Sequence, residues 1–276
     1  ESSWRSGSGL WNQITDELLP PTGGLLSSEK LPSFTVRAVA RSIPEPMSAS
    51  PKELITNGLL GLSERLEEYK KQGAVFTKWR AVFRIDGDML PSAQAIHENV
   101  KRLAIYAKEA QAVGLVPILE PEVSLEGKQS RMRARAVMGE VLKTLFATLN
   151  EHSVDRASIV LKTSMVLSGS ESGKRDTPEE VALDTLAVLM ENVPSQIAGI
   201  VFLSGGQTPD QATENLAAIT KRAKEVSAPW PLTFSYARAL QEEALAIWKG
   251  KEENIPAARA AFLARLARVS AAAIGN

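Results

Sequence analysis

The chain contains no cysteine, and this excludes disulfides, thiolate nucleophiles and thiolate metal ligands together. Histidine is nearly absent too. His97 and His152 lie far apart on polar stretches, so we expect solvated surface residues rather than metal ligands. No apolar run approaches the roughly 20 residues that cross a bilayer. These absences predict no metal cofactor and no membrane partner, and they are typical of a cytoplasmic enzyme.

Neither sign of charge is in excess, because the 276 residues include 32 Lys plus Arg and 32 Asp plus Glu. Without an overall basic field we expect no nucleic-acid partner, and any anionic ligand must be bound by local charges. The length fits one large α/β barrel or two ordinary domains. The chain begins at Glu1 without a hydrophobic signal region, which we interpret as a fragment or a processed chain.

From about residue 74 a short apolar, β-branched run is repeatedly followed by a longer run of helical periodicity, the pattern of βα units. Strands that are apolar throughout are buried on both faces, which favours a parallel sheet wrapped by helices. The predicted strands are Val75 to Ile85, Leu115 to Leu119, Ser158 to Val166, Ile197 to Leu203 and Leu232 to Tyr236.

The helices between these strands have marked starts and apolar faces. An N-cap threonine, a first-turn proline and a capping-box residue occur at Thr177, Pro178 and Glu180 and again at Thr208, Pro209 and Gln211. Apolar stripes are expected at Ile96, Val100 and Leu103 and at Leu186, Leu189 and Met190.

An open doubly wound sheet and a barrel both fit this order, but no G-x-G-x-x-G fingerprint follows any predicted strand, so we favour the barrel. Residues 1–44 differ in composition. Glycine, proline and serine are scattered through them, and only Phe34 to Val39 is strand-like. We expect residues 1–44 to be a divergent, poorly ordered segment and residues 45–276 to be the barrel domain.

Reactive groups in parallel barrels stand at the carboxyl ends of strands, so polar residues within or just after the apolar runs are the candidates. They are Lys78, Arg80, Glu120, Glu122, Lys162, Ser204, Gly205, Gly206, Ser235 and Arg238. Two lysines, two carboxylates, a glycine turn and an arginine at one rim suit imine chemistry on a phosphorylated sugar.

Apolar neighbours and a second cation favour the neutral, nucleophilic form of a lysine, which Lys162 and Lys78 would provide. Glu120 is placed to transfer the protons of carbinolamine formation and dehydration. Backbone N–H groups from Ser204 to Gly206, together with the Arg238 guanidinium, would bind a phosphate.

Each candidate also has a purely structural interpretation. The lysines are alternatively snorkelling side chains, and the two glutamates are salt-bridge partners. If the strand continues through Pro121, Glu120 and Glu122 share one face and need nearby cations. The glycine pair is alternatively a tight turn, and Arg238 a helix-start residue.

Several blocks of the chain resemble class I fructose-bisphosphate aldolases, and we expect the bacterial type. The likeness runs in family order from about Glu45 to the C-terminus. Its blocks are GLSERLEEYKKQGAVFTKWR, GLVPILEPEV, VLKTSMV, GIVFLSGGQTPDQATENLAAI and PWPLTFSYARALQEEALAIWKGKEEN.

The resemblance implies a (β/α)8 TIM barrel, assembled as a homotetramer, that cleaves fructose 1,6-bisphosphate reversibly into dihydroxyacetone phosphate and glyceraldehyde 3-phosphate without a cofactor. Lys162 would form the Schiff base, Glu120 would be the acid/base carboxylate and Lys78 would position and polarise the substrate. Glu122 would support them. The implied phosphate-binding residues are Ser204, Gly205, Gly206, Ser235 and Arg238, with Arg80 at the other phosphate.

The chain also departs from the family pattern. It has Thr163 and Ser164 where the family has Pro-Asn, and Ala237 where the family has a glycine that accepts a positive φ. Two family strands, with an aspartate and a further lysine, have no counterpart in residues 1–44. We therefore expect the barrel to be incomplete at the N-terminus. If the chain is complete, we expect it to be a poor or inactive aldolase that is prone to aggregation. A noncatalytic scaffold or binding protein is the alternative.

The string Leu203 to Gln207 also spells LSGGQ, a signature of ATP-binding cassette ATPases. Those proteins need a G-x-x-x-x-G-K-[ST] loop as well. The nearest match, Gly169 to Arg175, is one residue too short and has arginine where Ser or Thr is required, so we set the ATPase interpretation aside.

Overall fold

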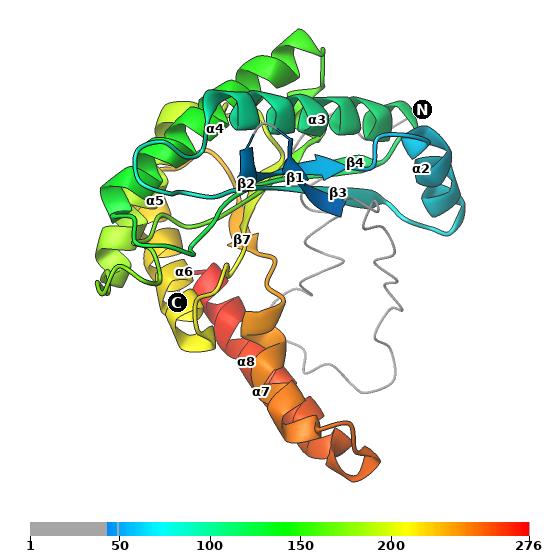
Figure 1. Ribbon diagram of the computed structural model, residues 1–276. Helices are drawn as coiled ribbons and strands as arrows, with labels where there is room; N and C mark the ends of the chain where they lie inside the picture. The colour runs from blue at the N-terminus through cyan, green and yellow to red at the C-terminus, as the bar shows by residue number, and fades with distance from the viewer. Residues whose placement is uncertain (1–42, 49, 276) are drawn as a thin grey trace.

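The computed structural model describes residues 43–48 and 50–275, and its centre is a parallel β-sheet (Figure 1). Each strand pairs in parallel with the next one along the chain, so every crossover joins neighbours. This confirms the predicted βα order. The strands are β3 (Phe76–Phe83), β4 (Val116–Val123), β5 (Val160–Thr163), β6 (Gly199–Phe202) and β7 (Leu232–Phe234).

The crossover helices cover one face of this sheet (Figure 1). They are α3 (Ala93–Ala112), α4 (Arg131–Glu151), α5 (Pro178–Asn192) and α6 (Pro209–Glu225), with a 3₁₀ turn η1 (Arg156–Ser158) before β5. The predicted stripe on α3 is buried throughout. On α5 the prediction was wrong for Met190, which is 47% exposed, because it lies about 100° around the helix from buried Leu189.

The two predicted helix starts differ in one respect. Thr177 forms a full capping box, since its hydroxyl accepts from Glu180 N and the Glu180 carboxylate accepts from Thr177 N. The Thr208 hydroxyl accepts from Gln211 N, but the reciprocal bond, from the Thr208 N–H to the Gln211 side chain, is not formed. The second prediction was therefore right for the cap and wrong for the box.

Apolar side chains pack on both faces of the sheet, as the sequence predicted. Toward the helices, Trp79, Leu119, Leu161 and Phe202 are completely buried in the main core. A second, smaller cluster lies on the other face, and its strand members have the opposite parity. Its members are Val116, Val160, Ala198 and Val201, with Phe76 and Ile118 packed against them. This second face corresponds to the interior of a barrel, and it carries the candidate catalytic side chains.

Within the described residues the sheet is open, because β3 and β7 are its end strands and it holds five of the eight strands of a closed (β/α)8 barrel. Several predicted strand ends were displaced. β4 continues past Glu120 because its pairing with β3 runs on to Val123. β5 ends at Thr163, and the hydroxyl of the next residue, Ser164, donates to the Val123 carbonyl, 2.9 Å away.

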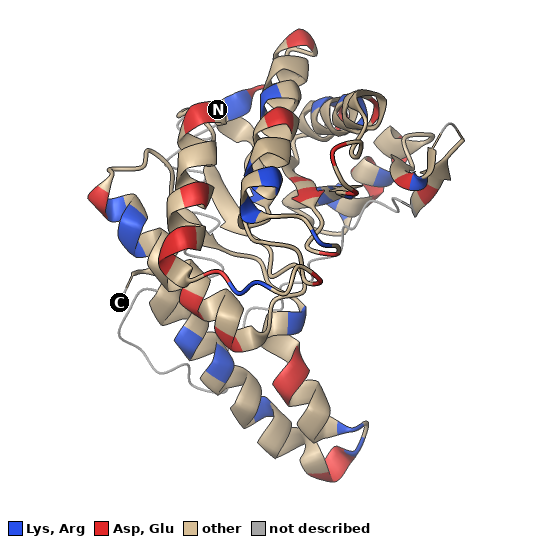
Figure 2. Ribbon diagram, turned by 60° about the vertical axis from the view of Figure 1, so that its left-hand side comes forward, with Lys and Arg blue, Asp and Glu red and all other residues tan. Residues whose placement is uncertain are grey.

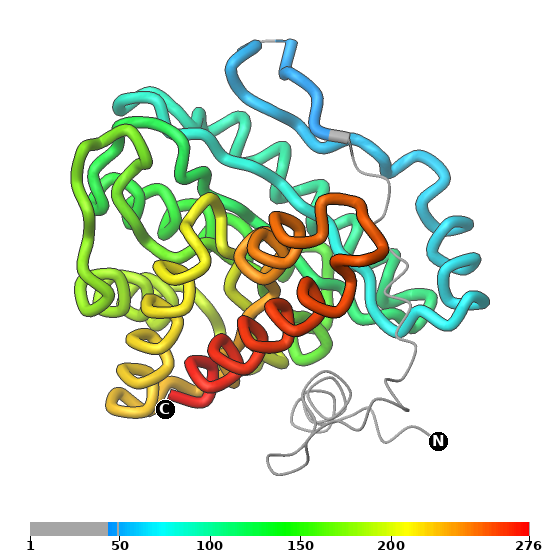
Figure 3. The backbone as a smooth tube through the Cα atoms, turned by 90° about the horizontal axis from the view of Figure 1, so that it is seen from below, coloured from blue at the N-terminus to red at the C-terminus, as the bar shows by residue number. Residues whose placement is uncertain are grey.

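An antiparallel hairpin, β1 (Ile43–Met47) and β2 (Ser50–Asn57), precedes helix α2 (Leu62–Lys71) and was not predicted. It lies at the periphery of the fold (Figure 3). The Thr56 hydroxyl donates to the Arg80 carbonyl of β3 at 2.8 Å, and Asn99 of α3 bonds to the Thr56 and Leu54 backbone. The strand-like run Phe34 to Val39 lies outside the described residues.

At the other end of the chain, α7 (Arg238–Trp248), η2 (Glu252–Asn254) and α8 (Ile255–Ala273) form an arm of two adjacent helices that projects from the sheet (Figure 1). Lysine, arginine and acidic residues are interspersed along the outer helices (Figure 2). In the part of the chain that the structure describes, no helix has the length and apolar character needed to span a membrane.

Candidate active site

Lys162 lies on β5 with its side chain on the face opposite the helices. Its parity is that of Val160, and its strand partner on β6 is Val201, so apolar side chains of the small cluster flank it. The Lys162 side chain is 14% exposed, and its Nζ lies 3.1 Å from Oε1 of Glu120. The lysine thus has the apolar surroundings expected from the sequence and one direct polar partner.

Glu120 is the centre of the cluster. Its side chain is 5% exposed and contacts two cations, Lys162 through Oε1 and Lys78 through Oε2 at 2.7 Å. The three residues come from three successive strands whose register brings their side chains together on one face. The two ammonium groups compensate the charge of this buried carboxylate from both sides.

Arg80 and Glu122 form the next pair along the same two strands. The guanidinium donates two hydrogen bonds to the carboxylate, at 2.6 and 2.8 Å, and these bonds raise the pKa of Arg80 above its usual value. The strand does run on through Pro121, so Glu120 and Glu122 share a face and each has its own cation. The cations that the sequence analysis required next to these two glutamates are therefore present.

The Ser204 to Gly206 segment follows β6 as a tight turn, closed by the Gln207 N–H donating to the Ser204 carbonyl at 3.0 Å. Gly205 and Gly206 have φ of +49° and +89°, a region that side chains rarely adopt. A Cβ at Gly205 would also come within 2.7 Å of Leu203 Cδ1. Both glycines are therefore required by the backbone, which confirms the tight turn.

Ser235 and Arg238 lie at the end of β7, next to that turn, because the Ser235 N–H donates to the Phe202 carbonyl at 2.8 Å. Both side chains are exposed, and Arg238 is the first residue of α7, as its structural interpretation predicted. Ala237 has φ of −107°, so the expected conflict with a positive φ is wrong for this chain.

The candidate residues therefore form three groups. Lys78, Glu120 and Lys162 make contact, and Arg80 and Glu122 pair beside them. No hydrogen bond or ion pair among the described residues links either group to the turn after β6 or to the residues after β7. Those segments share the rim only because the carboxyl ends of parallel strands lie at one edge of the sheet.

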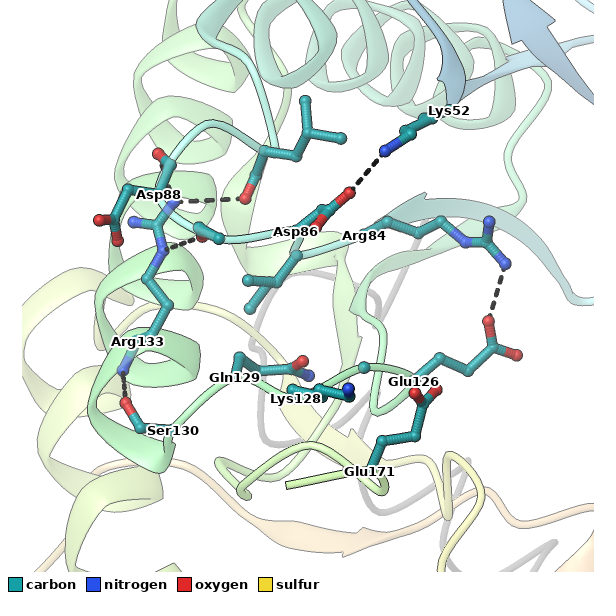
Figure 4. Close-up of a pocket in the computed structure, with 14 residues that line it drawn as sticks. Lys52, Arg84, Asp86, Asp88, Glu126, Lys128, Gln129, Ser130, Arg133 and Glu171 are labelled. Carbon is teal, nitrogen blue, oxygen red and sulfur yellow. Dashed lines mark hydrogen bonds and ion pairs between the residues drawn. The ribbon is translucent and has the colours of Figure 1, made fainter. Parts of the chain in front are cut away.

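A charged cavity of about 770 Å³ beyond the ends of β3 and β4 was missed from the sequence (Figure 4). Two ion pairs line it, Arg84 with Glu126 and Lys52 with Asp86. Arg84 and Glu126 are 42 positions apart, as are Lys78 and Glu120 and also Arg80 and Glu122. That constant offset, together with strand parity, was the signal that could have revealed the pair.

The structure also tests the histidines. His97 is exposed, and His152 caps the end of α4 with its ring Nδ1 2.9 Å from the Thr148 carbonyl. Over residues 43–48 and 50–275, no three His, Asp or Glu side chains gather in an arrangement that could hold a metal ion. His97 is the exposed surface residue that the sequence predicted, whereas His152 is half-buried at the end of α4.

Comparison with known proteins identifies the family. A sequence model described as fructose-bisphosphate aldolase class-I matches residues 28–276. The chain belongs to this family. Aldolase B from Ovis aries is 46% identical over 231 residues, which are 84% of this chain and 63% of the relative. The cytosolic aldolase 4 of Arabidopsis thaliana is 45% identical over 225 residues, 81% of this chain and 56% of the relative.

A solved fructose-bisphosphate aldolase from Plasmodium falciparum is 40% identical, with a TM-score of 0.81 over 84% of this chain and 67% of that one. The predicted α/β fold of the aldolase barrel is thereby confirmed. The aldolase-family chain spans about six tenths of the length of the curated relatives named above. Those relatives are animal and plant proteins, so the bacterial type stays a prediction.

Proposed function

We propose that this chain performs the imine chemistry of a class I fructose-bisphosphate aldolase, reversibly cleaving fructose 1,6-bisphosphate into dihydroxyacetone phosphate and glyceraldehyde 3-phosphate. The observation that carries the proposal is the contact of Lys162 and Lys78 with the two oxygens of Glu120. Membership of the family supports the choice of substrate.

The proton movements follow from this contact. Transfer of one ammonium proton from Lys162 to Glu120 leaves a neutral amine and a neutral carboxylic acid 3.1 Å apart. The amine nitrogen then attacks the ketone carbon, and one of its two protons moves to the ketone oxygen to give a carbinolamine. The acid returns its own proton to the carbinolamine hydroxyl, which departs as water. The resulting iminium at Lys162 accepts the electron pair of the breaking carbon–carbon bond and becomes an enamine. Glu120, a carboxylate again, accepts the proton of the C4 hydroxyl, and glyceraldehyde 3-phosphate leaves as the aldehyde.

The neighbouring charges have supporting roles in this proposal. Lys78 forms an ion pair with Glu120, and its charge balances the carboxylate and polarises the substrate. Glu122 fixes Arg80 at the open face of the sheet, in a position to contact the second phosphate. The first phosphate is assigned to Ser204, Gly205, Gly206, Ser235 and Arg238, at the adjoining ends of β6 and β7.

The assembly and the location of the protein are part of the proposal. We expect a homo-oligomer, specifically a homotetramer, which light scattering after gel filtration measures directly. We also expect the protein in the cytoplasm, and the relative from Arabidopsis thaliana, named as cytosolic, supports that expectation.

Borohydride trapping tests the imine. Dihydroxyacetone phosphate and the reductant should attach a stable adduct to Lys162, located by peptide mass spectrometry, and Lys162→Ala should abolish it. Lys143→Ala, which changes an exposed lysine on α4, is the matched control and should keep the adduct. Absence of an adduct on the parent chain would favour the noncatalytic scaffold or binding protein. A parallel assay of fructose 1,6-bisphosphate cleavage separates imine formation from complete turnover.

A further inference from the structure

Gln207, the residue that closes the turn after β6, has a buried side chain held from two sides. Its Oε1 accepts from Nδ2 of Asn215 at 2.6 Å, and its Nε2 donates to Sδ of Met165 at 3.6 Å. Gln207 is 6% exposed and Asn215 is 1% exposed. Because hydrogen bonds to a thioether are weak, the bond from Asn215 is the main restraint on the Gln207 amide.

Asn215 is in an unfavourable place for an asparagine. It lies inside helix α6, where asparagine has low helix propensity, and its amide is removed from water. Its hydrogen bond to Gln207 offsets this cost. The bond joins the helix to a residue whose own N–H donates to the Ser204 carbonyl, so α6 restrains the Ser204 to Gly206 turn.

A second bond ties the end of β7 to the same part of α6. The Tyr236 hydroxyl donates to the Ala212 carbonyl at 2.8 Å, and Tyr236 is 8% exposed. Tyr236 directly follows Ser235 and lies two residues before Arg238. Ala212 and Asn215 are neighbours one turn apart on α6. One turn of one helix therefore holds both segments assigned to the phosphate.

We propose that Asn215, acting through Gln207, and Tyr236 are positioning residues that set the spacing between the Ser204 to Gly206 turn and the Ser235 to Arg238 segment. The proposal rests on the proposed function, since it takes these segments as the binding site of the substrate's first phosphate. A phosphate binds several donors at once only if their separation is fixed before it arrives. Helix α6 provides that fixed separation.

Comparison of two ketones in the trapping experiment isolates this role. Dihydroxyacetone phosphate needs both the imine site and the phosphate site, whereas dihydroxyacetone needs only the imine site. In Asn215→Leu and Tyr236→Phe we expect the half-saturating concentration of dihydroxyacetone phosphate to rise about three- to tenfold, the effect of one hydrogen bond. Trapping of dihydroxyacetone should stay within about twofold of the parent, because Lys162 and Glu120 are untouched.

Tyr106→Phe is the matched control. It also deletes one buried tyrosine hydroxyl, which lies 2.7 Å from the Thr77 hydroxyl between α3 and β3. This variant should keep the parent's preference for the phosphorylated ketone, which shows that a general loss of stability does not produce the effect. Tyr236→Phe removes a single oxygen, so it keeps the test decisive if Asn215→Leu does not fold.

The possible outcomes are distinguishable. A lower preference for the phosphorylated ketone in the α6 variants, with the Tyr106→Phe control unchanged, supports the positioning role. An unchanged preference in the folded variants, while the parent still forms the adduct, overturns the positioning role and leaves the imine proposal standing. A parent chain that forms no adduct with either ketone overturns the proposed function and this inference together.

Discussion

Lys162 Nζ lies 3.1 Å from Oε1 of Glu120, on a sheet face where the apolar side chains of Val160 and Val201 flank the lysine. Lys78 forms an ion pair with the second carboxylate oxygen, so each oxygen of Glu120 contacts an ammonium group. A carboxylate in this position both accepts a proton from the amine and returns it to the departing oxygen. The pairing therefore predicts that imine formation depends on Glu120 more than on any other carboxylate near it.

Glu120→Gln should slow borohydride-trapped adduct formation at Lys162 by about 10²- to 10⁴-fold, the range by which a positioned acid or base accelerates a reaction. The amide keeps the shape of the side chain but transfers no proton between nitrogen and oxygen. Rapid-quench trapping with dihydroxyacetone phosphate measures the rate. Glu122→Gln is the control, because it changes the neighbouring carboxylate on the same face and should slow trapping far less. Equal slowing by both variants would contradict the assignment.

Part of this site follows from the sequence. Alternation along β4 places Glu120 and Glu122 on one face, and the βα order makes β3, β4 and β5 neighbours, so the sequence alone is enough to place Lys78, Glu120 and Lys162 together. The sequence did not give the register between neighbouring strands, that is, which residue of β3 lies opposite which residue of β4. In the parallel pairing of β3 with β4, Lys78 lies opposite Ile118, and its side chain contacts the carboxylate two residues further along β4. Without that register the equivalent Arg84–Glu126 pair was overlooked.

The hairpin before α2 shows what else the sequence did not predict. Pro44 and Pro46 alternate with Glu45 in β1, and prolines count against a strand because they lack an N–H donor. An edge strand tolerates them, since only one of its sides pairs. Whether a segment is an edge strand depends on tertiary packing, here the bonds from Thr56 and Asn99, which local sequence does not encode.

Alkaline pH should destabilise the fold through Tyr106. Burial raises the pKa of this phenol above its ordinary value of 10.0, and its hydrogen bond with the Thr77 hydroxyl opposes the rise in part. A raised folded-state pKa means that the stabilisation is complete below pH 10 and is lost as pH rises, because only the unfolded chain ionises. The free energy of unfolding should then fall by about 1.4 kcal/mol per pH unit for this group.

Urea unfolding of the parent and of Tyr106→Phe between pH 8 and 11 checks this expectation. Comparison of the two slopes cancels the contribution of every group that the two proteins share. The variant should be less stable than the parent at pH 8 and should lose less stability toward pH 11. Parallel curves across the whole range would show that Tyr106 ionises in the folded protein.

Arg265 should hold the arm of α7 and α8 against α6. Its side chain is 1% exposed and donates to Glu243 on α7 and to Asp210 on α6, the latter at 2.8 Å. The hydrogen bonds from Arg265 lower the pKa of both carboxyls. Because one guanidinium joins three helices, Arg265→Met should increase amide hydrogen exchange in α7 while leaving α3 unchanged.

Arg268→Met is the matched control for the arm. Arg268 contacts the same Asp210 and Glu243 carboxylates at 3.3 and 3.7 Å but is 55% exposed. Solvent screens its ion pairs, so its removal should change exchange in α7 little. Equally faster amide hydrogen exchange in the two variants would mean that burial of Arg265 does not make its ion pairs stabilise the arm more than those of Arg268.

The starts of α5 and α6 offer a comparison of two caps within one chain. Thr177→Ala and Thr208→Ala each remove one hydroxyl that accepts from a backbone N–H, so each should cost about 1 kcal/mol of unfolding free energy. Substitution of the residue three positions after each cap should change stability by different amounts. Glu180→Ala loses the bond to Thr177 N and an ion pair with Arg131 at 3.1 Å, whereas Gln211→Ala loses no hydrogen bond described in the structure.

The effect of Glu180→Ala should also depend on pH. The bond from the Thr177 N–H, followed by that from Arg131, holds the pKa of the Glu180 carboxyl below its ordinary value of 4.5. A depressed folded-state pKa gives stability that is present above pH 4.5 and is lost as pH falls through the folded value. The difference in urea midpoint between parent and Glu180→Ala should therefore be largest near neutral pH and shrink in acid, while Gln211→Ala follows the parent throughout. A difference that persists unchanged at pH 3 would show that Glu180 acts through packing and not through its charge.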